Sequence, residues 1–174
     1  MNETNCKCVE SKHFIPKVGK FEKVSYNEFE KTIPNSSDVY DAITLPKRAT
    51  KGSAGYDVCT PVEINLKPGQ DICVPTGLKC KIANGWALFA LPKSGLGFKF
   101  YTRLANTIGL IDEDYYNNEN NEGHMFVKVR NEGTKDLHVD AGKAVCQFVF
   151  LPYGITEDDE TDGVRTGGFG STNS

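Results

Sequence analysis

The sequence predicts an all-β fold, an antiparallel barrel or sandwich built from short strands. From residue 55 onward, short apolar runs are separated by turn signals every eight to twelve residues, as at 67–69 and 84–85. No amphipathic helical pattern lies between these runs, and this combination is typical of antiparallel β domains. Strands are expected at 55–59, 62–66, 71–74, 78–82, 86–91, 104–110, 125–130, 136–139 and 144–151.

The first 40 residues predict an N-terminal extension that is only partly ordered. Residues 1–20 are polar and lack a period, which is typical of a loose arm. Ser25 followed by Glu28 fits a capping box, so a short helix is expected at 26–31. Turn-forming residues dominate 34–41. We therefore expect one short helix beside the strands.

The rest of the chain divides at an acidic run. We expect a barrel domain over 41–156, followed by an acidic linker and a flexible C-terminal segment over 157–174. The run at 157–162 carries four acidic residues in its first four positions, which is typical of a solvated linker. The 174 residues correspond to one ordinary domain with a core of its own.

Composition excludes several classes of protein. No apolar run approaches the roughly 18 residues that a membrane helix needs, and no signal-peptide pattern follows Met1. A formal charge of −3 argues against general nucleic-acid binding. We therefore expect a partner neither in membranes nor in nucleic acid.

The cysteines indicate a reducing compartment. Disulfide frameworks are typical of small secreted domains, and the six cysteines here follow no regular spacing. Three of them, Cys73, Cys80 and Cys146, lie in apolar stretches and are expected to be buried as small hydrophobic residues. We expect a cytoplasmic protein.

Five segments combine small residues with groups that bind anions or transfer protons. Asp57 enters a strand after a permissive turn, whereas Lys93, the Ser94 hydroxyl and nearby backbone N–H groups suit a phosphate. Asp112 follows an apolar run, and Gln147 enters an apolar strand. The segments are 48–57, 91–97, 106–115, 142–147 and 163–172.

Each segment taken alone also fits a structural role. Glycines in the first two segments suit barrel turns, and carboxylates at 112–114 suit a solvated hairpin tip. The glycine-rich end suits a flexible tail. However, Arg165 supplies a guanidinium with several hydrogen-bond donors and Phe169 supplies an aromatic ring. A linker with no binding role needs neither.

The five segments in this order resemble the five motifs of the trimeric deoxyuridine triphosphate nucleotidohydrolase (dUTPase) family. The resemblance runs from about residue 45 to residue 172, and the stretch 115–125 is similar to that of Gram-positive bacterial or phage dUTPases. It implies a jelly-roll-like β-clip subunit. It also implies a homotrimer whose active sites combine residues from different subunits.

The resemblance implies hydrolysis of dUTP to dUMP and pyrophosphate by water attack on the α-phosphorus. Asp112 matches the family's general base, although Asp114 suits that role equally on bare chemistry. Mg²⁺ is implied as the cofactor, with Asp57 matching the aspartate that holds it through water.

The resemblance also implies roles in substrate binding. Asn106 and the backbone of Gly109, Leu110 and Ile111 would read uracil, and Tyr115 would pack under the deoxyribose. Phosphates would contact Lys93, Ser94, Gly95 and Gln147. The tail would close as a lid, with Phe169 over the base and Arg165, Gly170, Ser171 and Thr172 on the distal phosphates.

Two departures from the family motifs and two rival functions remain open. Lys93 stands where arginine is usual and loses the bidentate fork, and Ala144 stands where arginine is frequent.

One rival function is that of a dCTP deaminase-like nucleotide enzyme of the same fold. The other is a non-catalytic regulatory protein, whose protein partner would bind through 1–40 or the long loop 116–124.

Overall fold

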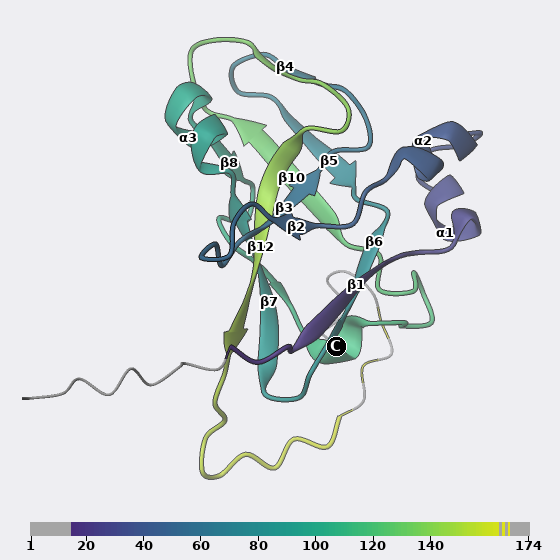
Figure 1. The fold of residues 1–174 in the computed structure, drawn as a ribbon, viewed down its shortest axis with the longest axis vertical. Coiled ribbons are helices and arrows are strands. Elements are labelled where there is room, and N and C mark those ends of the chain that lie inside the picture. The colour runs from purple at the N-terminus through teal and green to yellow at the C-terminus, as the bar shows by residue number, and fades with distance from the viewer. Residues whose placement is uncertain (1–14, 164, 166, 168–174) are drawn as a thin grey trace, which may run out of the picture.

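The computed structural model describes residues 15–163, 165 and 167 as four antiparallel sheets with short helices at their edges (Figure 1). The sheets have the strand orders β1-β6, β5-β10-β8, β11-β4 and β2-β3-β12-β7-β9. The strands are β1 (Gly19–Lys23), β2 (Lys47–Arg48), β3 (Tyr56–Cys59), β4 (Ile64–Leu66), β5 (Asp71–Pro75), β6 (Leu78–Ile82), β7 (Trp86–Pro92), β8 (Thr102–Leu104), β9 (Gly109–Ile111), β10 (Phe126–Asn131), β11 (Leu137–Val139) and β12 (Ala144–Pro152).

The strand expected at 104–110 is wrong, because this apolar stretch forms two strands and a turn. β8 ends at Leu104 and pairs with β10, whereas β9 begins at Gly109 and pairs with β7. Between them, Thr107 adopts a φ of 66°, and its N–H donates to the Leu104 carbonyl at 2.9 Å. A left-handed β-branched residue carries no signal in an apolar pattern, so the reversal was missed.

The capping box correctly predicted helix α1 (Tyr26–Glu30). The Ser25 hydroxyl accepts from the Glu28 N–H at 3.1 Å, as the motif requires. The reciprocal contact differs, since the Ser25 N–H donates to the Glu122 carboxylate at 2.9 Å. The structure adds two helices to the predicted one. They are α2 (Ser37–Ala42), in the stretch expected to be turns, and α3 (Ser94–Phe100).

The N-terminal segment packs into the same core as the strands. Phe29 of α1 is fully buried in the cluster that contains Phe148 of β12. Phe21 of β1 stacks on Phe148, with ring centroids 6.0 Å apart. Residues 19–29 therefore contribute to the hydrophobic core of the molecule.

Strand β12 lies at the centre of the five-stranded sheet. It pairs with β3 on one side and with β7 on the other, and β7 pairs in turn with β9 (Figure 1). The register against β3 shifts between Ala144 and Cys146, which places Gln147 opposite Asp57. A shift of this kind re-aims the side chains that follow it.

The burial of the cysteines was predicted correctly for two of three. Cys80 and Cys146 are buried, but Cys73 is exposed. The alternation along β5 places Cys73 on the outer face of its sheet, which an apolar run alone does not reveal. All four cysteines of the described ranges are unpaired thiols.

Within 15–163, no helix has the length and apolar character needed to cross a bilayer.

His124 is a fully buried imidazole between α1 and the strands. Its Nε2 accepts from the Gly77 N–H at 2.9 Å, whereas Nδ1 makes no hydrogen bond to any described residue. The Glu28 carboxylate is the nearest acidic group, at 3.9 Å from Nδ1. Burial lowers the pKa of His124 from 6.5 to about 4.

This shift predicts a loss of stability in mild acid. Between pH 6.5 and about 4 the unfolded chain binds a proton that the folded chain does not, so the free energy of unfolding falls as the pH falls. The shift corresponds to about 3 kcal/mol, complete near pH 4. Urea unfolding across pH 7 to 4 measures it. His124→Gln should reduce the slope in this window, while the control His138→Gln, at an exposed site, should retain it. Equal slopes in both variants would contradict the assignment.

Candidate active site

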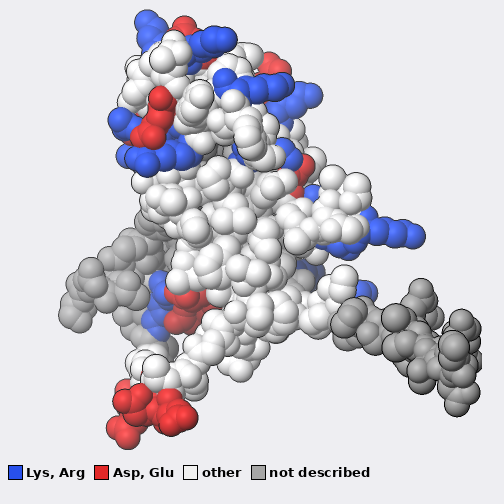
Figure 2. Space-filling model, turned by 90° about the vertical axis from the view of Figure 1, so that its left-hand side faces the viewer, with Lys and Arg blue, Asp and Glu red and all other residues white. Residues whose placement is uncertain are grey.

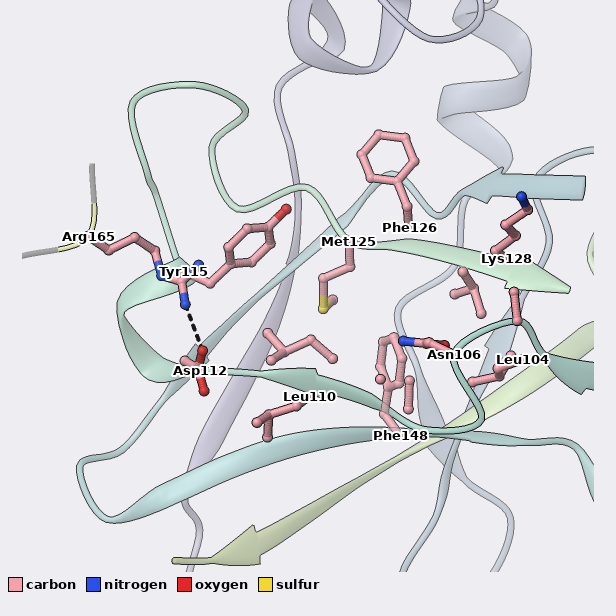
Figure 3. Close-up of a pocket in the computed structure, with 15 residues that line it drawn as sticks. Leu104, Asn106, Leu110, Asp112, Tyr115, Met125, Phe126, Lys128, Phe148 and Arg165 are labelled. Carbon is pink, nitrogen blue, oxygen red and sulfur yellow. Dashed lines mark hydrogen bonds and ion pairs between the residues drawn. The ribbon is translucent and has the colours of Figure 1, made fainter. Parts of the chain in front are cut away.

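A pocket of about 420 Å³ opens between the turn that joins β8 to β9, β10 and the 3-10 helix η1 (Glu113–Tyr115) (Figure 3). Seven residues expected from the sequence line it. They are Asn106, Gly109, Leu110, Ile111, Asp112, Tyr115 and Arg165. The segment 106–115 and one residue of the C-terminal segment thus meet at a single cavity.

One wall of the pocket is the backbone edge of β9. Gly109 lies opposite Ala90 of β7, and a Cβ at position 109 would come within 3.0 Å of the Ala90 Cβ. The Leu110 side chain is largely exposed, and Asn106 is exposed in the turn between β8 and β9. This wall offers backbone N–H and C=O groups beside one amide side chain, a combination that fixes the orientation of small polar ligands.

Asp112 lies at the rim of the pocket, where β9 gives way to η1. Its side chain is about half exposed. The Arg165 guanidinium donates to the Asp112 carboxylate at 2.6 Å (Figure 3) and to the Asp114 carboxylate at 2.8 Å. Arg165 also lies over the Tyr115 ring, 5.7 Å from its centroid. The arginine expected on substrate phosphates therefore contacts the predicted base.

Tyr115 forms a buried side of the same pocket. Its hydroxyl donates to the His124 carbonyl at 2.9 Å and accepts from the Asn121 amide at 2.9 Å. Burial raises the pKa of the Tyr115 phenol, so the ring stays neutral at physiological pH. The hydroxyl is fixed by the protein and is directed away from Asp112 (Figure 3).

A second group of predicted residues gathers around Asp57, outside the lining of the pocket. The Asp57 Oδ1 accepts from the Lys93 ammonium at 2.6 Å and from the Gln147 amide at 2.9 Å. Burial alone raises the pKa of Asp57, but the hydrogen bonds from Lys93 and Gln147 and the lysine charge lower it below its ordinary value. The segments 48–57, 91–97 and 142–147 thus meet in one cluster.

Ser94 and Gly95 begin α3 directly after Lys93 and are both exposed. A Cβ at position 95 would meet nothing within 4 Å, so nothing inside this chain requires glycine there. A glycine that internal packing does not explain suits the close approach of a ligand or of another subunit.

Sequence reasoning missed about half of the pocket lining. Several apolar residues of β7, β10 and β12 contribute to it. The alternating pattern of those strands indicated that these residues face inward, but it did not indicate a pocket. The missed residues are Ala90, Leu104, Ala105, Met125, Phe126, Val127, Lys128 and Phe148. The predicted residues Phe169, Gly170, Ser171 and Thr172 lie outside the described residues.

The donor set suits a cation that is shared with a ligand. No cluster of three or more His, Cys, Asp or Glu side chains within the described ranges could hold a metal by itself. Mg²⁺ is usually bound by one or two carboxylates together with waters and substrate phosphates. Asp57, with both of its side-chain contacts on Oδ1 and 30% of the side chain exposed, fits such a role.

The fold and the pocket define an all-β protein with a site for a small polar ligand, bordered by a carboxylate and an arginine. A family model described as dUTPase matches residues 41–173. The chain therefore belongs to the dUTPase family, as the sequence motifs predicted.

Individual relatives agree with this assignment. The chain is 42% identical over 132 residues to the deoxyuridine 5'-triphosphate nucleotidohydrolase of Lactococcus lactis, which covers 75% of this chain and 88% of that one. The Bordetella pertussis protein of the same name is 39% identical, covering 74% and 87%. The crystal structure of dUTPase from Streptococcus mutans has a TM-score of 0.65 at 34% identity, covering 79% and 98%. Staphylococcus aureus phage phi11 dUTPase, at 16% identity and a TM-score of 0.60, shares the fold.

The Asp57 cluster predicts a measurable change in acidity. Replacing Lys93 with Met removes a hydrogen bond and a positive charge that lower the pKa of Asp57, so this pKa should rise. A carboxyl-carbon NMR titration measures the change. The control Lys79→Met removes an ammonium that contacts Asn117 and Glu122 instead, and it should leave Asp57 unaffected. An unchanged Asp57 titration in Lys93→Met would refute the contact.

Proposed function

We propose that this chain hydrolyses dUTP to dUMP and pyrophosphate, which limits uracil in DNA and supplies dUMP for thymidylate synthesis. The observation that carries the proposal is the position of Asp112. It places a half-exposed carboxylate at the rim of a pocket whose wall is a backbone edge, within a chain of the dUTPase family.

Asp112 is the proposed general base. A carboxylate within hydrogen-bond reach of a water can orient it and accept its proton as it attacks the α-phosphorus. The water oxygen forms the new bond to phosphorus, and the bond from phosphorus to the pyrophosphate oxygen breaks. Asp114 is more exposed and lies outside the pocket lining, which favours Asp112 for this role.

The uracil ring is proposed to bind along β9. Asn106 and the backbone of Gly109, Leu110 and Ile111 supply donors and acceptors for the edge of a pyrimidine. Tyr115 would pack beneath the deoxyribose, where its buried ring leaves little room for a 2′-hydroxyl. The proposed slot along β9 would be too narrow for the methyl group of thymine.

Phosphate binding would redirect Arg165. In the free chain the guanidinium contacts Asp112 and Asp114, and a polyphosphate is a stronger competing acceptor because it carries more charge. Transfer of Arg165 to the phosphates would leave Asp112 available to the attacking water. Lys93, Ser94, Gly95 and Gln147 would contact phosphates from the Asp57 cluster, while Phe169, Gly170, Ser171 and Thr172 would complete the lid.

Mg²⁺ is the proposed cofactor, and Asp57 would hold it through water. When bound, this cation neutralises the charge that develops on the phosphates. A structural neighbour, a mutant dUTPase from phage phi11 of S. aureus, is described as coordinating a structural Mg(II) ion. In the free chain the Lys93 ammonium partly balances the Asp57 charge.

A homotrimer is the proposed assembly, since one chain divides the predicted residues into two groups. The pocket contains Asp112 and Tyr115, but Asp57, Lys93 and Gln147 lie outside its lining. A neighbouring copy would bring its own Asp57 cluster to the pocket. Several large apolar side chains are exposed, including Phe98 at 89% and Tyr101 at 71%, and Figure 2 displays a broad band with few charges. The four cysteines of the described ranges are unpaired, which favours a cytoplasmic location.

A nucleotide panel tests the activity. Pyrophosphate and ammonia release should be measured with dUTP, dCTP, dTTP and UTP, and only dUTP should yield pyrophosphate rapidly. Asp112→Asn should bind dUTP but lose about 10²–10⁴-fold in turnover, as expected for removal of a general base. Ammonia released from dCTP would favour deamination instead, and near-normal turnover of Asp112→Asn would exclude it as the base.

The C-terminal segment predicts a separate loss. Deleting residues 165–174 removes Arg165 and the proposed lid, so turnover should be abolished because water exclusion and the phosphate contacts are lost. Sedimentation should still report the same oligomer and circular dichroism the same fold. A deletion that dissociates the oligomer would make the segment structural rather than catalytic.

A further inference from the structure

Loop 116–124 is the asparagine-rich segment between η1 and β10, and it contacts Tyr115. Its residues hold both ends of Tyr115. The Asn118 amide donates to the Tyr115 carbonyl at 3.0 Å, and the Asn121 amide donates to the Tyr115 hydroxyl at 2.9 Å. The ring that borders the pocket is therefore fixed by this loop.

Asn121 makes four contacts of its side-chain amide. Its oxygen accepts from the Asn118 amide at 2.7 Å and from the Gly123 N–H at 3.1 Å. Its nitrogen donates to the Tyr115 hydroxyl and, at 3.3 Å, to the His124 carbonyl. The carboxamide therefore uses its oxygen as an acceptor twice and its nitrogen as a donor twice. Asn121 therefore joins the turn of the loop to the phenol of Tyr115.

The backbone of the loop turns at Gly123, two residues after Asn121. Gly123 has a φ of 79°, and a Cβ there would lie 2.5 Å from the Tyr115 carbonyl oxygen. The loop closes against the Tyr115 backbone at this glycine, two residues after Asn121, whose amide contacts the Tyr115 hydroxyl. A larger residue at position 123 would push the two apart.

The outer side of the loop is tied to the N-terminal segment. Glu122 accepts from the Ser25 backbone N–H and hydroxyl, and Tyr116 donates to the Glu22 carboxylate at 2.5 Å. The Lys79 ammonium contacts Asn117 at 2.7 Å and Glu122 at 3.3 Å. Residues 22–25 precede the part of the chain that the dUTPase family model matches. Contacts from outside the matched region thus hold the loop that holds Tyr115.

We propose that Asn121 is a positioning residue that fixes the Tyr115 ring and thereby sets the discrimination between deoxyribose and ribose. This inference rests on the proposed function, in which the sugar lies on Tyr115. A phenol held from behind by two hydrogen bonds cannot withdraw to admit a 2′-hydroxyl. Loosening that hold should weaken discrimination more than it weakens turnover of dUTP.

Asn121→Asp tests the two donations of the Asn121 nitrogen, to the Tyr115 hydroxyl and to the His124 carbonyl. The aspartate retains the oxygen that accepts from Asn118 and Gly123. It has no N–H to donate to the Tyr115 hydroxyl, and its second oxygen repels the His124 carbonyl, so the arrangement that fixes the phenol is broken. The measured quantity is kcat/KM for dUTP divided by kcat/KM for UTP. We expect this ratio to fall about tenfold, the effect of losing one or two hydrogen bonds. The control Asn117→Asp makes the same chemical change where the oxygen accepts from Lys79, and the ratio should not change.

Tyr115→Phe provides the second arm and does not depend on the folding of the loop variant. It retains the contacts of Asn121 with Asn118, Gly123 and the His124 carbonyl while cutting the link to the ring. The ratio should fall by a similar factor, and Asn121→Asp should add little when it is combined with Tyr115→Phe. An unchanged ratio in Tyr115→Phe would overturn the proposal. So would a loss caused by Asn121→Asp that is as large in the Tyr115→Phe protein as in the wild type.

Failure of the proposed function gives a different result. If the wild-type chain releases pyrophosphate from neither dUTP nor UTP, the proposed activity is wrong. The relative affinity for dUMP and UMP, measured by calorimetry, then reports the same discrimination. A ratio that is identical in wild type and Asn121→Asp would overturn the role of Asn121, and a lower ratio in the variant would support it.

Discussion

The register of strand β12 is the constraint on which both chemical regions depend. Its pairing with β3 places Gln147 opposite Asp57, and its pairing with β7 carries β9 into place. Side chains alternate along a strand, so a slip by one residue would turn Gln147 to the other face of the sheet. The shift between Ala144 and Cys146 sets this register before Gln147 is reached. One irregularity in one strand therefore aligns the Asp57 cluster.

In both chemical regions a cationic side chain pairs with a carboxylate. In the free chain Lys93 contacts Asp57, and Arg165 contacts Asp112 and Asp114. Each cation partly balances a carboxylate that the proposed reaction needs, and each is an attractive partner for a phosphate. Binding of a polyphosphate would exchange these ion pairs for new ones between the cations and the phosphates. The cations are therefore paired with an anion both before and after binding. Lysine at position 93 suits this exchange, since its single ammonium holds Asp57 through one oxygen.

The sequence predicted most strands because turn residues separate them, and it predicted α1 because a cap needs only neighbouring residues. It missed the reversal at Thr107, where an apolar run conceals a left-handed residue. Motif order predicted the lining from Asn106 to Tyr115, since these residues are contiguous. The contacts of Arg165 with Asp112 and Asp114 could not be predicted, because spacing carries no information about which of several acceptors a long side chain reaches.

The partner of Ser25 illustrates a further limit of local motifs. A capping box predicts that Glu28 satisfies the Ser25 N–H, yet Glu122 does so across 97 positions, and Glu28 pairs with Lys31 instead. The helix start and loop 116–124 therefore depend on each other. Removing either one leaves polar groups of the other without their partners, at a cost comparable to a lost hydrogen bond or more. A segment that precedes the region matched by the family model therefore supports the loop beside the pocket.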